Sequence, residues 1–148
     1  MLNDVKEFSD KFGLKALPAP GFLSDEDMKK RLDFQFEELL ETAHAAGFFF
    51  DSTKMEFIRS QAMPRNLAEV LDGLVDQVYV ALGTAHLMGL GYKIGDEEPG
   101  SAYEYPPFKR AWGRVHQANM KKEIVPGMWK IQKPDGWVRP DLSDLVGE

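Results

Sequence analysis

Six carboxylates stand at helical spacing in two segments of the chain that are otherwise rich in large apolar residues. They are Glu37, Glu38 and Glu41 in the first segment and Glu69, Asp72 and Asp76 in the second. Residues three or four positions apart share one face of an α-helix, so each segment presents its acids together. Acids this close raise one another's pKa unless a cation neutralises them. The pattern predicts a site for a hard cation such as Mg²⁺, which binds oxygen ligands and often substrate phosphates.

Each acid also has an ordinary explanation. Glutamate is common on solvated helix faces, so a single ExxE is weak evidence for a metal. Glu69 lies three residues after Asn66, where it could be the glutamate of a capping box. Asp72 and Asp76 are harder to explain, because aspartate disfavours helix interiors and is rarely buried unpaired. Two acidic sets on two successive helices favour the metal interpretation.

A second metal interpretation uses Glu41 and His44, which form an ExxH sequence. Ferritin-like di-iron bundles use two such motifs together with two further glutamates. Neither His86 nor His116 completes a second motif, since each follows a glycine three residues earlier. Di-iron chemistry is therefore not expected, and we interpret His44 as a surface or packing residue.

Helix signals surround the acids. The first acidic segment belongs to a helix from the N-cap Ser24 to Ala46, closed by Gly47, and the second to a helix from the N-cap Asn66 to about residue 90. Further helices are expected over 2–11 and 107–122. Residues 48–65 are ambiguous, and we expect a buried turn at 48–50 and a short helix at 55–62. The prediction is an all-α bundle of four or five helices without a strand.

Composition limits the class of protein. The 148 residues fit one domain, 1–148, with a helical core over about 24–122 and an irregular tail over 123–148. The chain lacks cysteine, which excludes disulfides and thiolate metal sites. A net charge of −6 argues against nucleic acid as a partner. Neither a signal peptide nor an apolar run of ~20 residues is visible, so we expect a cytoplasmic protein without a membrane partner.

Three longer motifs carry a resemblance. Residues 72–85 match DxLxDxxYVxxGTA, residues 116–122 match HxxNMxK, and residues 133–142 match KPxGWxxPDL. With Glu38-x-x-Glu41 and Glu69-x-x-Asp72, they resemble the MazG-like all-α nucleoside triphosphate pyrophosphohydrolases, in the compact single-domain branch of phages and bacteria. The matches cover roughly residues 30–142 and are specific in this order. Asp76 goes beyond the minimal pattern, and the acidic segment 91–107 has no counterpart that we can align.

The resemblance implies cleavage of a (d)NTP between its α- and β-phosphates to give a (d)NMP and pyrophosphate. It implies Mg²⁺ or Mn²⁺, two or more ions per site, in a homo-oligomer (dimer or tetramer) with sites near the subunit interfaces. The location would be the cytoplasm, or the host cytoplasm if the protein is phage-encoded.

Roles follow for individual residues. The expected metal ligands are Glu37, Glu38, Glu41, Glu69 and Asp72. Glu37 or Glu38 could also act as the catalytic residue that orients or deprotonates the attacking water. The expected substrate-binding residues are Asn119, Lys122, Lys133 and Trp137, although Trp137 could equally pin the tail.

The substrate itself stays open at this stage. The phage-like signature favours a purine deoxynucleotide such as dGTP, and the alternative is a housecleaning hydrolase for dUTP or non-canonical nucleotides. A different class is a non-catalytic helical bundle that binds a nucleotide or a protein. Intact ExxE and ExxD pairs argue against that class, because a decayed site is expected to lose an acid first.

Overall fold

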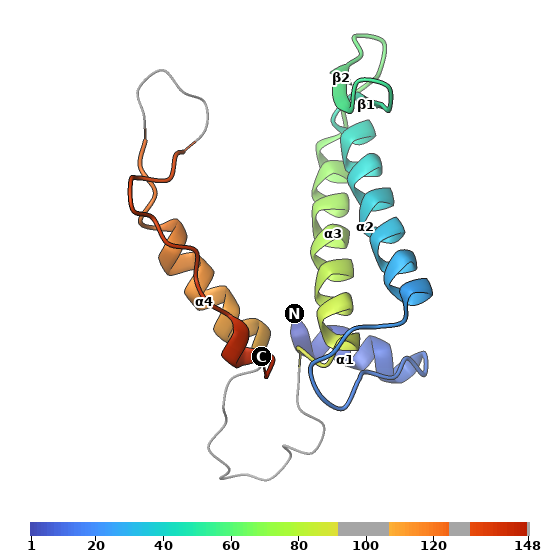
Figure 1. Ribbon diagram of the computed structural model, residues 1–148. Helices are drawn as coiled ribbons and strands as arrows, with labels where there is room; N and C mark the ends of the chain where they lie inside the picture. Colours follow the sequence, from blue (N-terminus) through green and yellow to red (C-terminus); the bar gives the residue numbers. More distant parts are fainter. Residues whose placement is uncertain (92–106, 125–130, 148) are drawn as a thin grey trace.

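Two antiparallel helices of equal length carry all six carboxylates (Figure 1). The structure, a computed structural model, describes residues 1–91, 107–124 and 131–147. Its elements are α1 (Leu2–Lys11), α2 (Asp25–Ala45), β1 (Phe48–Asp51), β2 (Glu56–Arg59), α3 (Leu67–Leu87), α4 (Pro107–Asn119) and the 3-10 turn η1 (Ser143–Leu145). The mainly helical prediction is confirmed, with four α-helices in the described ranges.

The two acid-bearing helices begin where their caps predict. Asp27 N–H donates to Ser24 Oγ over 3.1 Å at the start of α2. Ala68 N–H donates to Asn66 Oδ1 over 3.1 Å at the start of α3. Helix α2 ends at Ala45 and is followed by Gly47 with φ +83°, a left-handed conformation that suits glycine. The predicted boundaries of α2 therefore agree with the structure to within a residue.

Helices α2 and α3 are in close contact where Gly73 faces Thr42. A Cβ at Gly73 would lie 2.4 Å from Thr42 Oγ1, so only glycine allows this approach. Gln77 Nε2 donates to Thr42 Oγ1 over 2.7 Å, and that hydroxyl donates to the Glu38 carbonyl over 2.8 Å. This contact fixes the register of the two helices beside the acids.

A second tie joins the other end of the pair. Arg31 Nε on α2 donates to Thr84 Oγ1 over 3.0 Å, and Arg31 Nη2 donates to the Val80 carbonyl over 2.8 Å. Gly83 leaves room for this arginine, because a Cβ there would lie 3.0 Å from Arg31 Nη2. The α2–α3 pair is thus held by polar contacts at two levels.

A β-hairpin replaces the expected turn and short helix between the two long helices, so that prediction is wrong. Strands β1 and β2 pair antiparallel from Phe48↔Arg59 to Asp51↔Glu56. The run of phenylalanines favours a strand, and Met55 has φ +54°, which an α-helix over 55–62 would not allow. Asp51 Oδ1 accepts from Thr53 N–H over 2.9 Å and closes the turn.

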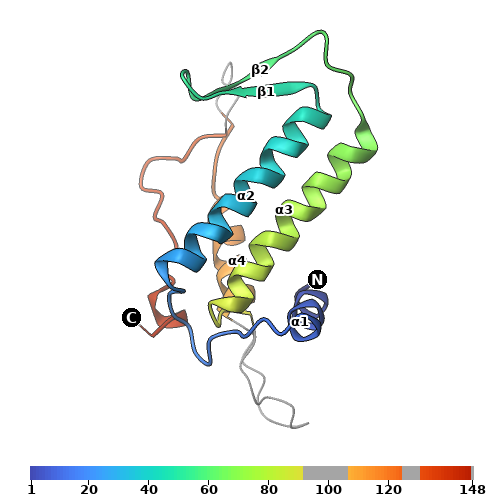
Figure 2. The same ribbon diagram turned by 90° about the vertical axis from the view of Figure 1, so that its right-hand side faces the viewer.

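Helix α1, which the sequence predicts, lies beside the lower part of α3, where Figure 2 shows it nearly end-on. Val5 is 1% exposed, and the rings of Phe8 and Tyr79 meet edge to face with centroids 5.6 Å apart. Leu17 N–H donates to the Leu87 carbonyl over 2.9 Å, which ties the following loop to the end of α3. Helix α3 ends three residues earlier than predicted, ahead of Gly89, which has φ +72°.

Helix α4 stands apart from the α2–α3 pair in Figure 1, and in the view of Figure 2 it lies behind that pair. It ends at Asn119, three residues before the predicted end. Arg114 Nη2 donates to Asp144 Oδ2 over 2.7 Å and holds the tail against this helix. The described tail residues otherwise have little regular structure, apart from η1 and one bridge between Glu123 and Gln132. Nearly all of the acidic segment 91–107 lies outside the described residues.

Much of the apolar surface of the helix pair is uncovered in the single chain. Leu71 is 63% exposed and Val75 54% exposed on α3, while Leu32 is 59% exposed on α2. Farther along α3, Leu82 is buried, whereas Val78 is exposed. None of the helices in the described ranges is both long and apolar enough to cross a membrane.

Candidate functional site

The antiparallel pairing of α2 and α3 sets the two acidic sets against each other. Partial burial raises the pKa of Glu38, and the negative charges of Asp76, Glu41, Glu37 and Asp72 raise it further. Four of the other five acids therefore act on one carboxyl group. Asp76 on α3 has the largest electrostatic effect among them.

Nothing in the described ranges neutralises these acids. None of the six forms an ion pair with a lysine or arginine there, whereas Glu26, Asp27 and Asp33 on the same helix α2 do so. Glu38 and Asp76 are partly buried and the other four acids are exposed, and carboxylates that share one region without a counter-charge repel one another. A bound divalent cation would remove that repulsion.

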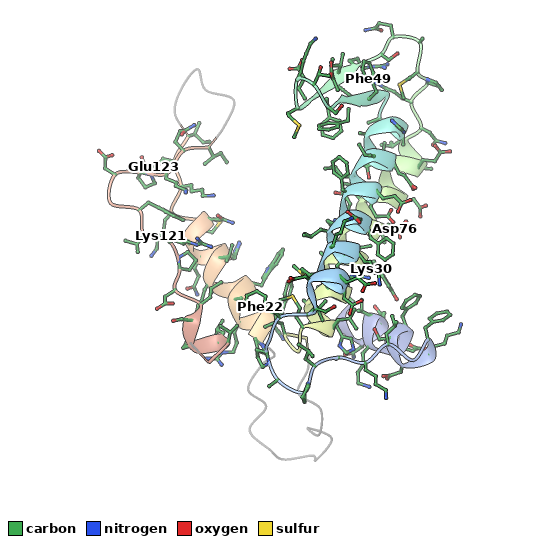
Figure 3. The ribbon with its side chains drawn as sticks, turned by 45° about the vertical axis from the view of Figure 1, so that its right-hand side comes forward. Phe22, Lys30, Phe49, Asp76, Lys121 and Glu123 are labelled. Atoms are coloured by element: carbon green, nitrogen blue, oxygen red, sulfur yellow. The ribbon has the colours of Figure 1, made fainter. Side chains whose placement is uncertain are left out.

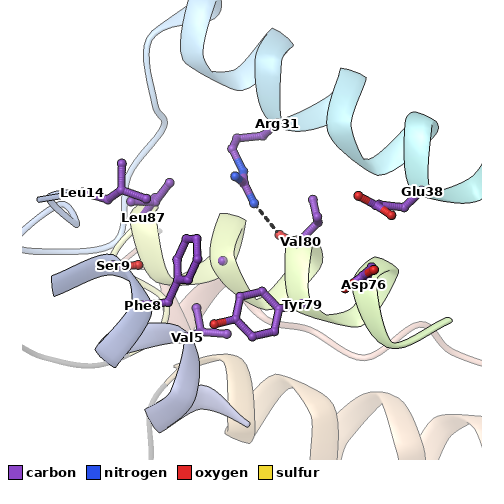
Figure 4. A pocket seen from close by; sticks show the side chains of 11 residues that line it. Val5, Phe8, Ser9, Leu14, Arg31, Glu38, Asp76, Tyr79, Val80 and Leu87 are labelled. Carbon is purple, nitrogen blue, oxygen red and sulfur yellow. Dashed lines mark hydrogen bonds between the residues drawn. The ribbon is translucent and has the colours of Figure 1, made fainter. Parts of the chain in front are cut away.

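Two hollows flank the acids. The larger, of about 700 Å³, is lined by four of them, Glu41, Glu69, Asp72 and Asp76, and also by His44. The smaller, of about 410 Å³, is lined by Glu38 and Asp76 together with residues of α1 (Figure 4). Asp76 is common to both hollows and so lies at the centre of the arrangement.

Glu69 is free of the capping role that its sequence position suggested. The Asn66 side chain accepts from Ala68 N–H and Glu69 N–H, as an N-cap should. A capping box would also need the Asn66 N–H to donate to the Glu69 carboxylate. That N–H instead donates to the Ala45 carbonyl over 2.9 Å. The Glu69 carboxylate is left to line the larger hollow.

The donor chemistry suits a hard cation, but the ligands do not converge on one point. All candidate donors are carboxylate oxygens, the type that Mg²⁺ prefers. In the ranges that the structure describes, no three acidic or histidine side chains lie together closely enough to hold an ion. Glu37 is exposed and lines neither hollow. Binding an ion between α2 and α3 would require the flexible glutamate arms to turn inward.

The four expected substrate-binding residues gather elsewhere. Lys122 Nζ and Lys133 Nζ lie 6.0 Å and 4.6 Å from the centroid of the Trp137 ring, beyond the exposed Asn119 that ends α4. Trp137 Nε1 donates to the Ala118 carbonyl over 2.9 Å, so this indole pins the tail to α4. Neither hollow includes these residues. In Figure 3, the neighbouring Lys121 and Glu123 are well separated from Asp76.

Two residues of the site have no role in the sequence-based prediction. The sequence pattern gives Asp76 no role as a metal ligand, although Asp76 follows Asp72 by four residues and so shares its helix face. Arg31 is absent from it, although it lies seven residues before Glu38 and hence two helical turns away on the same side of α2. Helical spacing is the signal that could have found both.

Comparison with known proteins identifies the family. The family described as phosphoribosyl-ATP pyrophosphohydrolase matches residues 5–94, a span that begins within α1 and includes α2, the hairpin and α3. The chain belongs to this family, which is part of the MazG-like all-α nucleoside triphosphate pyrophosphohydrolase superfamily. Its members are pyrophosphohydrolases that typically depend on Mg²⁺. No curated protein matches the chain. The matched span contains all six acids and none of the cluster around Trp137.

Proposed function

We propose that this protein is a metal-dependent (d)NTP pyrophosphohydrolase that cleaves between the α- and β-phosphates and releases a (d)NMP and pyrophosphate. The observation that carries the proposal is the set of facing, unneutralised carboxylates on α2 and α3, inside the span that matches the pyrophosphohydrolase family. A triphosphate is strongly anionic, so such a surface can accept it only together with cations.

The proposed ligands of two or more Mg²⁺ or Mn²⁺ ions are Glu37, Glu38, Glu41, Glu69 and Asp72. Asp76 joins them, because it has the largest electrostatic effect on Glu38 and lines both hollows. When bound, the ions screen the phosphate charge and acidify water.

Glu38 is the proposed general base, with Glu37 beside it as the other candidate. The half-buried Glu38 carboxyl has its pKa raised by burial and by the neighbouring acids, which brings it nearer to the working range of a base. It would take the proton from the water that attacks the α-phosphorus. The bond from that phosphorus to the bridging oxygen then breaks, and pyrophosphate leaves with the bond's electrons. Most of the rate enhancement would come from positioning and charge neutralisation.

The proposed working form is a cytoplasmic homo-oligomer, a dimer or tetramer. The exposed apolar side chains on α2 and α3 support an interface between copies, since isolated chains rarely leave such patches uncovered. The nucleotide bound at one subunit would then be contacted by four residues of a neighbouring subunit, Asn119, Lys122, Lys133 and Trp137. The substrate that we favour is a deoxynucleotide such as dGTP, with dUTP or a non-canonical nucleotide as the alternative.

Pyrophosphate release tests the proposal. Purified protein with Mg²⁺ or Mn²⁺ should release pyrophosphate from at least one member of a panel of canonical and modified (d)NTPs. Glu38→Gln, Asp72→Asn and Asp76→Asn should each abolish release while the helical circular dichroism spectrum is kept. Asp33→Asn removes an acid on α2 that is paired with Lys29, so it serves as the matched control and should retain activity. Binding of nucleotides without any pyrophosphate release across the panel would instead indicate a non-catalytic bundle.

A further inference from the structure

The smaller hollow continues from the acids into an apolar pocket between α1 and the α2–α3 pair (Figure 4). The walls of this pocket are formed by aliphatic and aromatic side chains, those of Val5, Phe8, Leu14, Tyr79 and Leu87. Its volume of about 410 Å³ lies within the range of small-molecule sites. One end opens beside Glu38 and Asp76, so a molecule that has its phosphates near the acids could place its other end inside.

One cationic side chain lines this pocket without an anionic partner. The Arg31 guanidinium is half-buried and pairs with no carboxylate within the described ranges, and burial lowers its pKa. Ser9, which is 2% exposed, adds a hydroxyl to the wall. Since buried polar groups are normally satisfied, the N–H groups of Arg31 that its two hydrogen bonds leave unused are available to a ligand.

Arg31 is also held in place before any ligand arrives. Its bonds to Thr84 Oγ1 and the Val80 carbonyl use Nε and one N–H of Nη2. The remaining N–H groups lie on the end of the guanidinium, where Nη1 and Nη2 can donate in parallel. Such a fork matches a ligand that presents two adjacent acceptors.

We propose that this pocket binds the nucleobase of the substrate and that Arg31 selects guanine through its O6 and N7 acceptors. A phosphate is a poorer occupant, because the walls are mostly apolar and the acids at the mouth repel an unscreened anion. Guanine presents O6 and N7 side by side, the pair that arginine reads most often in nucleic acids. Adenine presents N7 beside an amino donor and leaves one N–H unpaired. The inference rests on the proposed function and names the base that the pyrophosphohydrolase would prefer.

The first test needs no variant. The kcat/KM for pyrophosphate release is measured with dGTP, 7-deaza-dGTP, dATP and dCTP under the same Mg²⁺ concentration. Replacing N7 by carbon removes one acceptor and leaves the phosphates and the sugar unchanged. We expect kcat/KM to fall at least fivefold from dGTP to 7-deaza-dGTP, and by a similar factor or more to dATP. Equal values for dGTP and 7-deaza-dGTP, or a preference for dCTP, would overturn the assignment.

The second test places the effect on Arg31. In Arg31→Gln, kcat/KM for dGTP should fall at least fivefold, and dGTP and 7-deaza-dGTP should become equivalent. Arg31→Lys keeps the charge but lacks the fork, so it should not restore discrimination. Lys29→Gln removes a positive charge from the exposed side of the same helix, where it pairs with Asp33, and should leave the preference intact. An equal loss for every nucleotide in Arg31→Gln would contradict base recognition and indicate a purely structural role.

Binding measurements separate the two proposals. Calorimetry with a non-hydrolysable α,β-imido dGTP and its dATP counterpart, with Mg²⁺ present, reports base preference without turnover. Guanine preference in binding without pyrophosphate release would retain the pocket and refute the hydrolase. Pyrophosphate release without any base preference would retain the hydrolase and refute the pocket.

Discussion

Gly73→Ala is the substitution that tests most directly whether the α2–α3 contact organises the acidic site. The added Cβ would lie 2.4 Å from Thr42 Oγ1 and 3.3 Å from Thr42 Cα, which is backbone and cannot turn away. To reach an ordinary contact of about 3.4 Å, the new methyl group and the Thr42 hydroxyl must separate by roughly 1 Å. Thr42 Oγ1 also accepts from Gln77 and donates to the Glu38 carbonyl, so the same movement weakens two hydrogen bonds.

Gly73→Ala changes the free energy of unfolding through opposing contributions. Overpacking costs about 1–3 kcal/mol, and the strained hydrogen bonds cost about 1 kcal/mol more. Replacing glycine by alanine inside a helix returns about 0.5–1 kcal/mol. We therefore expect the free energy of unfolding, measured by urea titration with circular dichroism, to fall by about 1–3 kcal/mol. A Cβ added at Gly113 in α4 would meet nothing within 4 Å, so Gly113→Ala is the control and should be stabilising by about 0.5–1 kcal/mol.

The same substitution should affect activity more than stability. A displacement of about 1 Å in a catalytic arrangement can reduce the rate about 100-fold, and Mg²⁺ tolerates little departure from octahedral geometry. The Mg²⁺ concentration for half-maximal pyrophosphate release should rise, while Gly113→Ala leaves it unchanged. Removing the Thr42 hydroxyl in Gly73→Ala/Thr42→Ala should recover part of the lost activity. If Gly73→Ala is as stable and as active as the unaltered protein, the close contact does not position the acids.

Three further outcomes follow from single contacts. The pKa of Glu38 is raised in the folded protein above its unfolded value of about 4.5. The contribution of Glu38 to the free energy of unfolding is therefore fully present below pH 4.5 and is lost as pH rises through the folded pKa. In metal-free protein, Glu38→Gln should abolish this loss of stability, measured by urea titration above pH 4.5. Asn66→Ala should lower the free energy of unfolding by about 1 kcal/mol, because the α3 N-cap is lost, and Asn66→Asp should restore it. Trp137→Phe removes the hydrogen bond to the Ala118 carbonyl; the tail should then be cleaved faster by trypsin, while an unchanged cleavage rate would show that the indole does not hold it.

The local features of the fold could be predicted because their signals are local. Ser24 and Asn66 cap the helices that they were expected to cap, and an N-cap needs only the residues that follow it. The hairpin was missed because short apolar runs fit a strand, a turn or a buried helix equally well. Met55 adopts a left-handed conformation, which is compatible with the hairpin turn and not with a helix over 55–62. Methionine has no preference for that conformation, so the sequence does not predict it.

The site shows the same division between local and distant information. Spacing within one helix was enough to place Glu38 beside Glu41. Which acid of α3 faces Glu38 depends on the register of two helices, and the Gly73–Thr42 contact that fixes the register joins distant parts of the sequence. The role of Asp76 could therefore not be settled from spacing. The separation of Lys122 and Trp137 from the acids was hidden for the same reason, since it depends on where α4 lies.

The connection between α2 and α3 has a consequence for how the protein folds. Only residues 46–66, most of them in or next to the hairpin, separate the two acid-bearing helices. Closing a loop of that length costs little entropy, and contacts close in sequence tend to form quickly. We expect the acidic face to assemble early, from one contiguous stretch of chain, before α4 and the tail acquire their places. The mutual repulsion of its carboxylates would then oppose the first steps of folding, and divalent cations should accelerate refolding as well as stabilise the folded protein.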